Sequence, residues 1–97
     1  MPAAFLLADI EVLDARKYDI YRTQAVATVV AHGGEFLAGG GRFRRLEGDE
    51  PLPTIFVVKF ESYEQALAWY YSEEYDRVKA LRHGAAHANL VVVEGAS

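Results

Sequence analysis

The sequence contains no cysteine among its 97 residues, and this absence excludes disulfide bonds, thiolate catalysis, iron–sulfur clusters and cysteine-ligated zinc. It also has no long hydrophobic run: the stretch from Pro2 to Ala8 is too short to span a membrane. No basic residue precedes that stretch and Asp9 follows it directly, so we expect no signal peptide and no membrane contact. A cysteine-free chain suits a reducing compartment, and we expect a cytoplasmic protein.

Positive charge is scarce as well. Ten Lys and Arg residues stand against 14 Asp and Glu residues, which gives a formal net charge of −4 and a pI near 5.3. Nucleic-acid-binding domains usually carry a basic face, so we expect no nucleic-acid partner. The hydrophobic share of 52% is typical of a globular chain rather than a disordered one. The length predicts a single domain over residues 1–97.

Hydrophobic periodicity predicts four strands and two helical regions. Asp14 is a favourable N-cap for the first helix; Ser62 and Ser72 are favourable N-caps in the second helical region, which we expect to break near Ser72. The glycines at 39–41 interrupt the second strand, which we expect to continue beyond a bulge or bend. The predicted strands cover 3–12, 35–38 with 42–46, 54–60 and 89–94, and the predicted helical regions cover 15–31 and 63–83.

This β-α-β-β-α-β order predicts an α+β protein with the ferredoxin-like fold, a four-stranded antiparallel sheet with both helices on one face. The strands are nevertheless apolar on both faces: Phe5 and Leu7 point away from Leu6, Ala8 and Ile10. Helices can cover only one face, and the other would expose an apolar patch larger than monomers usually show. We therefore expect a homodimer in which two sheets pack face to face as a barrel.

Two charged residues lie on the face that is expected to meet the second sheet. Asp9 is in phase with Leu7, and Lys59 is in phase with Val57. A buried charge must be paired or hydrated. These residues therefore either sit at the rim of the barrel or line a polar pocket within it.

Short motifs spread over nearly the whole chain carry a family resemblance. They are Ala8-Asp9-Ile10-Glu11-Val12, Tyr18, Tyr21-Arg22, Gly33-Gly34 with Phe36-Leu37, Trp69-Tyr70-Tyr71-Ser72-Glu73-Glu74-Tyr75, Lys79, Arg82 and Asn89-Leu90-Val91-Val92-Val93-Glu94-Gly95. With these motifs the sequence resembles the domain-of-unknown-function 1330 family, whose usual form has asparagine where Tyr71 stands and proline where Glu74 stands. The resemblance implies a dimeric α/β barrel but no reaction, because structural relatives include cofactor-free monooxygenases, haem-degrading enzymes and ligand-binding regulatory modules.

The aromatic segment and the basic residues after it are candidate ligand-binding positions. An aromatic cluster either forms a pocket wall for a planar ligand or packs in the core and the dimer interface: Trp69, Tyr70, Tyr71 and Tyr75. Lys79 and Arg82 are three residues apart and share a helix face. They either clamp an anionic group or remain solvated near the negative end of the helix.

The three histidines and the glycine run have simpler interpretations. His83 and His87 have the i,i+4 spacing of a helical metal pair, but Gly84 is expected to end the helix between them, so we expect no metal site. His32 is expected at the end of the first helix, and any of the three histidines has the chemistry of a general base. The glycines at 39–41 lack the ending of a phosphate loop. The arginines that follow them form either an anion site or a solvated surface: Arg42, Arg44 and Arg45.

Three functions remain open from the sequence. The first is a small enzyme that acts without a bound cofactor on an organic molecule inside the barrel. Its candidate catalytic residues would converge on one cavity, with Trp69 and Lys79 as ligand-binding residues. The alternatives are a non-catalytic ligand-binding or regulatory module and a structural interaction protein. The five candidate catalytic residues are Asp9, Tyr70, Tyr75, Arg82 and Asn89.

Overall fold

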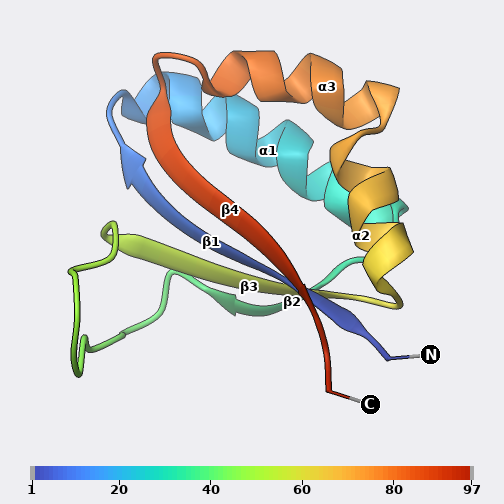
Figure 1. The fold of residues 1–97 in the computed structure, drawn as a ribbon. Coiled ribbons are helices and arrows are strands. Elements are labelled where there is room, and N and C mark those ends of the chain that lie inside the picture. The colour runs from blue at the N-terminus through green and yellow to red at the C-terminus, as the bar shows by residue number, and fades with distance from the viewer. Residues whose placement is uncertain (1, 97) are drawn as a thin grey trace.

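The computed structural model describes residues 2–96 and confirms the predicted order of elements (Figure 1). The second helical region breaks where Ser72 predicts it to break. The strands are β1 (Ala4–Val12), β2 (Glu35–Gly39), β3 (Thr54–Phe60) and β4 (Ala86–Glu94). The helices are α1 (Ala15–Ala31), α2 (Tyr63–Tyr70), α3 (Glu73–Lys79) and the short 3₁₀ helix η1 (Ala80–Arg82).

The four strands form one sheet in the order β2-β3-β1-β4, in which every neighbouring pair is antiparallel. Figure 1 shows all the helices on one side of this sheet. We call the opposite side the open face. Its register places Leu7 between Val57 of β3 and Val91 of β4, and Phe5 beside Val93. The ferredoxin-like fold and the α+β class are confirmed.

Residues of β1 point alternately to the two faces of the sheet and differ in their exposure to solvent. Leu6 and Ile10 point toward the helices and are buried, whereas Leu7, between them, is 41% exposed. The helix-covered side holds the hydrophobic core, in which Phe60, Trp69 and other aromatic residues dominate. Burial of such rings is the main source of stability that one small domain has.

The three predicted N-caps are confirmed by hydrogen bonds. The side chains of Asp14, Ser62 and Ser72 accept from the backbone N–H groups three residues later, at 3.1, 3.0 and 3.1 Å. These bonds satisfy amides that would otherwise lack partners in a first helical turn. Gly33 ends α1 with a φ of 80°, the left-handed conformation that favours glycine.

The predicted continuation of the second strand over 42–46 is wrong. β2 ends at Gly39, whose partner is Phe56, and residues 40–50 are exposed without helix or strand. Gly40 has a φ of 78°, which turns the chain away from β3 and removes the pairing that a strand needs.

The last strand also differs from the prediction: it begins at Ala86, three residues early, because Ala86 and Ala88 pair with β1.

Within residues 2–96, no helix combines the length and the apolar character that crossing a bilayer requires.

Candidate functional site

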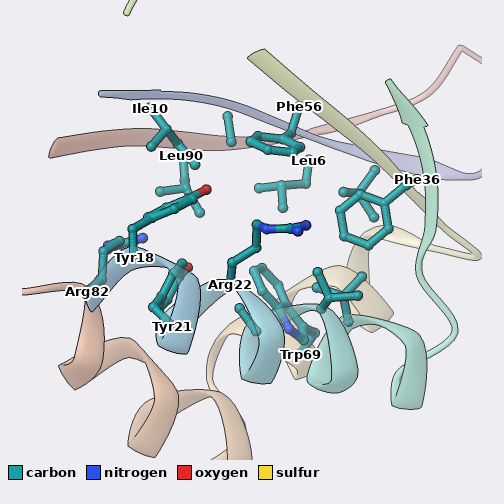
Figure 2. Close-up of a pocket in the computed structure, with 15 residues that line it drawn as sticks. Leu6, Ile10, Tyr18, Tyr21, Arg22, Phe36, Phe56, Trp69, Arg82 and Leu90 are labelled. Carbon is teal, nitrogen blue, oxygen red and sulfur yellow. The ribbon is translucent and has the colours of Figure 1, made fainter. Parts of the chain in front are cut away.

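A cavity lies between α1 and the helix-covered side of the sheet (Figure 2). It holds about 70 Å³ of free space and opens to solvent. We call it the helix-side cavity. Its walls are mainly apolar, as is usual for small-molecule sites. The residues that line it are Leu6, Ala8, Ile10, Tyr18, Tyr21, Arg22, Ala25, Val26, Val29, Phe36, Phe56, Val58, Trp69, Arg82 and Leu90.

Helix packing explains why the space exists at this position. The short helix α2 packs directly on β1, β3 and β4, whereas α1 packs chiefly against α3 and η1. Large side chains of α1, including Tyr18 and Tyr21, therefore occupy the layer between that helix and the sheet. Two phenols and two guanidinium groups bring polar atoms into an otherwise apolar space.

Tyr18 presents its hydroxyl group to the cavity. The residue is only 8% exposed, and its hydroxyl forms no hydrogen bond with any group of residues 2–96. Figure 2 shows the hydroxyl pointing from α1 into the cavity. Burial, and then the neighbouring Tyr21, raise the pKa of Tyr18, against the opposing charges of Arg22 and Arg82. The phenol therefore remains neutral near pH 7 and can donate a hydrogen bond to a ligand.

A chain of hydrogen bonds reaches the cavity from η1. Arg82 Nη1 donates to Tyr75 Oη at 3.3 Å, and Tyr75 Oη lies 2.8 Å from Tyr21 Oη. Because Tyr75 accepts from Arg82, the favoured arrangement has Tyr75 donate to Tyr21, which leaves the Tyr21 proton for the cavity. Burial, together with the neighbouring Tyr21, raises the pKa of Tyr75 well above its usual range, so this phenol also stays protonated.

Arg22 is the one lining guanidinium group without a protein partner in the part of the chain that the structure describes. It rises from α1 into the cavity (Figure 2) and forms no ion pair within residues 2–96. Arg82, in contrast, is held by Tyr75 and lies over the ring of Tyr21, 5.9 Å from its centroid. Among the described lining residues there is no Asp or Glu, and neither guanidinium group forms an ion pair within residues 2–96.

The break between α2 and α3 builds the wall behind these groups. Ser72 Oγ accepts from the Tyr75 amide and donates to the Trp69 carbonyl at 2.7 Å. The rings of Trp69 and Tyr75 lie 4.4 Å apart between centroids. Trp69 Nε1 donates to Thr28 Oγ1 at 3.0 Å, which ties this wall to α1. Trp69 is only 2% exposed and lines the cavity with its ring.

A second hollow, of about 210 Å³, lies on the open face and opens to solvent. Asp9 and Asn89 are opposite each other in its wall. Asp9 Oδ2 accepts from the backbone N–H of Leu52 at 2.8 Å, which fastens the end of the long β2–β3 loop to the sheet. Asp9 therefore has a structural contact that the sequence does not reveal.

Within a single chain, the five candidate catalytic residues do not line one common cavity. Asp9 and Asn89 face the open side, because side chains alternate along a strand. Arg82 lines the helix-side cavity, and the buried Tyr75 contacts it from behind. Tyr70 packs at 5.6 Å from Tyr75, between ring centroids. Their catalytic roles remain predictions.

The two candidate ligand-binding residues also separate. Trp69 lines the helix-side cavity. Lys79 does not: its Nζ lies 4.9 Å from the centroid of the Tyr70 ring and 4.0 Å from Asp76 Oδ1. A lysine that already rests on a ring and beside a carboxylate is engaged within its own helical segment.

The histidines are spread over three elements. His32 Nδ1 donates to the Thr28 carbonyl at 2.9 Å, while His83 follows η1 and His87 lies within β4. His83 and His87 thus never share a helix. Within residues 2–96 no three His, Asp or Glu side chains gather in a way that could hold a metal ion.

The arginines after the glycine run lie on the exposed β2–β3 loop. Arg45 Nε pairs with Glu50 Oε2 at 3.2 Å, and Arg42 and Arg44 line a shallow surface hollow. This arrangement agrees with the solvated alternative rather than with a built anion site.

Sequence reasoning missed Tyr18 and Arg22 as site residues. The signal was present in their spacing: positions 18, 22 and 26 recur every four residues and so share a face of α1. An arginine within a stripe of apolar helix residues points toward the layer that those residues cover. Composition alone could not show that this layer contains free space.

These features define the class of the protein as a ferredoxin-like α+β domain with a cavity between its first helix and its sheet. The family follows from the sequence: the model of the family described as a domain of unknown function (DUF1330) matches residues 3–96, and the chain belongs to that family. The resemblance noted in its motifs is thus confirmed. A search of curated proteins found no match.

Solved structures of low sequence identity share this fold. A protein of unknown function from Rhodopseudomonas palustris has a TM-score of 0.76 at 16% identity, over 99% of this chain and 84% of that chain. SnoaB, a cofactor-independent oxygenase from Streptomyces nogalater, has a TM-score of 0.70 at 6% identity, over 100% and 96%. A dimeric ferredoxin-like protein of unknown function from Thermobifida fusca has a TM-score of 0.51 at 13% identity, over 99% and 92%. At these identities the likeness establishes the fold alone.

Proposed function

We propose that this protein is a small enzyme that acts on an organic molecule held in the helix-side cavity, without a bound cofactor. The observation that carries this proposal is the Tyr18 hydroxyl, which faces an apolar cavity beside Arg22, is open to solvent there and forms no hydrogen bond within residues 2–96. Small-molecule sites typically combine apolar walls with a few polar groups that converge on the ligand. The cavity replaces the barrel interior that the sequence suggested as the place of reaction.

The hydrogen-bond donors of the cavity suit a reaction in which negative charge develops on a substrate oxygen. Tyr18 and Tyr21 bring hydroxyl groups to the cavity, and Arg22 supplies a cation. Fixed donors in a low-dielectric site stabilise such charge more strongly than water does. The cofactor-independent oxygenase SnoaB has the same fold, which is consistent with this class of activity.

A homodimer is part of the proposal. Leu7, Val91 and Val93 are 41%, 57% and 47% exposed on the open face, and they lie side by side in the register of β1 and β4. Contiguous apolar patches of this kind usually mark an interface. The dimeric ferredoxin-like protein from Thermobifida fusca shares the fold, which supports a second copy of the chain as the cover.

A non-catalytic ligand-binding module is the second candidate, and one observation favours it. The described residues that line the cavity include no His, Asp or Glu, the side chains that most often serve as general bases near neutral pH. A binding protein needs the pocket and its donors but no such base. Catalysis and simple binding therefore differ in whether the bound molecule is consumed.

Native mass spectrometry of gently purified protein, followed by denaturation of the same sample, tests binding and dimerisation together. We expect a dimer with a small molecule that leaves on denaturation. Val26→Trp fills the cavity from α1, and Val30→Trp makes the same change at an exposed position of that helix outside the cavity. The first variant should lose the retained molecule and the second should keep it. Retention in both variants would place the site elsewhere.

Incubation with a metabolite extract then separates the two candidates. Under the enzyme proposal, mass spectrometry shows one metabolite consumed and one formed with the wild-type protein and with Val30→Trp, but not with Val26→Trp. Binding without consumption would identify the protein as a ligand-binding module. A clean protein that neither retains nor consumes any molecule contradicts both candidates.

A further inference from the structure

We propose that the ligand of the helix-side cavity is an aromatic carboxylate, whose carboxylate group binds Arg22 and the Tyr18 hydroxyl while its ring packs among the apolar walls. This inference rests on the proposed function and names the chemical class that the cavity selects. It follows from the charge of the lining, from the number of free donors and from the shape of the walls.

The charge of the lining favours an anion. Two guanidinium groups face the cavity, and no described lining residue is acidic. The nearest acid on the same helix, Asp19, is close enough to affect Tyr18 but forms no ion pair with Arg22. Arg22 is an exposed residue that also lines the cavity, and no carboxylate pairs with it within residues 2–96, so its guanidinium group is available to an anionic ligand.

Arg22 rather than Arg82 is the group available to bind that anion. Arg82 already donates to Tyr75 and lies over the Tyr21 ring, so its position is determined by the protein. Arg22 has no such contact within residues 2–96. Tyr18 precedes Arg22 by one helical turn, so both side chains leave α1 on the same side. Together they offer a planar cation and one hydroxyl donor.

Two free donor groups suit a carboxylate better than a phosphate. A carboxylate has two oxygens in a plane, which match the flat guanidinium fork, and the Tyr18 hydroxyl can donate to one of them. Phosphate sites usually add several backbone N–H groups at a helix N-terminus or a glycine-rich loop. The described lining consists of side chains that belong to helices and strands, with no such loop.

The remaining walls suit an aromatic ring. Phe36 and Phe56 meet edge to face with their centroids 6.5 Å apart, and Trp69 lines the opposite helical side. Edge-to-face and offset contacts with such rings favour a flat apolar body. The 70 Å³ of free space is less than the roughly 150 Å³ of a cavity that encloses benzene. Because this cavity is open, the ring can enter with its carboxylate near Arg22, which is exposed to solvent.

Benzoate and benzamide form a matched pair of probes, because they have nearly the same shape and differ in charge. Titration of each into ¹⁵N-labelled protein, followed by nuclear magnetic resonance, locates binding and measures the dissociation constant. We expect benzoate to shift the amide signals of cavity residues and to bind roughly tenfold or more tightly than benzamide. Arg22→Gln should abolish that difference, and Tyr18→Phe should reduce it.

Arg16→Gln is the matched control, since Arg16 is an exposed arginine of α1 outside the cavity. It should keep the full preference for benzoate. The spectrum of each free variant reports whether the fold is intact, and Arg22→Lys, which keeps the charge, should recover part of the preference.

Equal binding of the two probes, or a preference that survives Arg22→Gln, would overturn the inference while leaving ligand binding in the cavity intact. Binding of neither probe to cavity residues would overturn the inference, and loss of the retained molecule in Val26→Trp would then show whether the proposed function survives. The two failures are therefore distinguishable.

Discussion

The two faces of the sheet are built from equally apolar residues but end in different environments. Leu6 and Leu7 are neighbours on β1, yet Leu6 is 5% exposed and Leu7 is 41% exposed. The helices of the same chain cover the first face, and no element of residues 2–96 packs over Leu7 and its neighbours. The chain thus covers only one of the two apolar faces of its sheet, and the proposed dimer would cover the other.

The polar groups of the two faces differ as well. On the open face, Asp9 is satisfied by the amide of Leu52, a contact within the chain. On the helix-covered face, Tyr18 and Arg22 have no partner within residues 2–96. A polar group paired within the chain is explained by the fold, whereas Tyr18 and Arg22 are open to solvent beside a cavity and remain available to a ligand. This contrast, rather than residue type, separates structural from functional candidates.

The largest effect is expected from a charge placed on the open face. Val91→Lys should weaken the proposed dimer roughly 1,000-fold or more, because the two-fold axis brings like charges together in an apolar interface. Ile20→Lys is the control: Ile20 is 55% exposed on α1, against 57% for Val91. Sedimentation of both variants over a range of concentrations measures the effect. A dimer that tolerates Val91→Lys would require another interface.

A smaller effect separates the two leucines. Leu6→Ala should lower the free energy of unfolding by about 3 kcal/mol, since it leaves a void in the covered core. In the Val91→Lys background, where the open face is uncovered, Leu7→Ala should cost less than about 1 kcal/mol. Urea denaturation measures both values. Equal costs would mean that the chain buries its open face by itself.

The smallest effect is the pH dependence of Tyr75. The folded state keeps this phenol neutral, whereas the unfolded chain ionises it near pH 10. The unfolded state therefore binds fewer protons above pH 10, and the free energy of unfolding falls as the pH rises. Between pH 9 and about pH 11, Tyr75→Phe should remove about 1.4 kcal/mol of this fall in total. Denaturation curves between pH 9 and about pH 11 test this, and an unchanged slope would contradict the assigned burial.

Local sequence patterns were sufficient for most of the fold. β3 and the N-caps of the helices were predicted because Thr54–Phe60 is rich in β-branched and aromatic residues, and because Asp14, Ser62 and Ser72 act within one turn. The start of β4 was missed because its first residues, Ala86 to Ala88, have little preference for strands and are held there by pairing with β1. The strand expected over 42–46 does not form, because these residues have no neighbouring strand to pair with.

The candidate site was less predictable. Alternation alone places Asp9 on the face opposite Ile10, but the hydrogen bond to Leu52 comes from 43 residues away and leaves no local trace. The cavity depends on how far α1 stands from the sheet, which is a property of the packing of α1 against α3 and η1. Trp69 and Arg82 were identified by their chemistry, whereas Arg22 required the structure.

The break at Ser72 also determines the direction in which Tyr75 points relative to Trp69 in the wall of the cavity. A continuous helix turns about 100° per residue, so residues six apart, such as Trp69 and Tyr75, would point in different directions and be separated along the axis. The two non-helical residues between α2 and α3 reset that rotation and bring the rings to 4.4 Å. Adding or removing one residue there would change the orientation of α3 relative to α2 and so the contact between the two rings. The length of this corner is therefore as much a part of the site as any side chain that lines it.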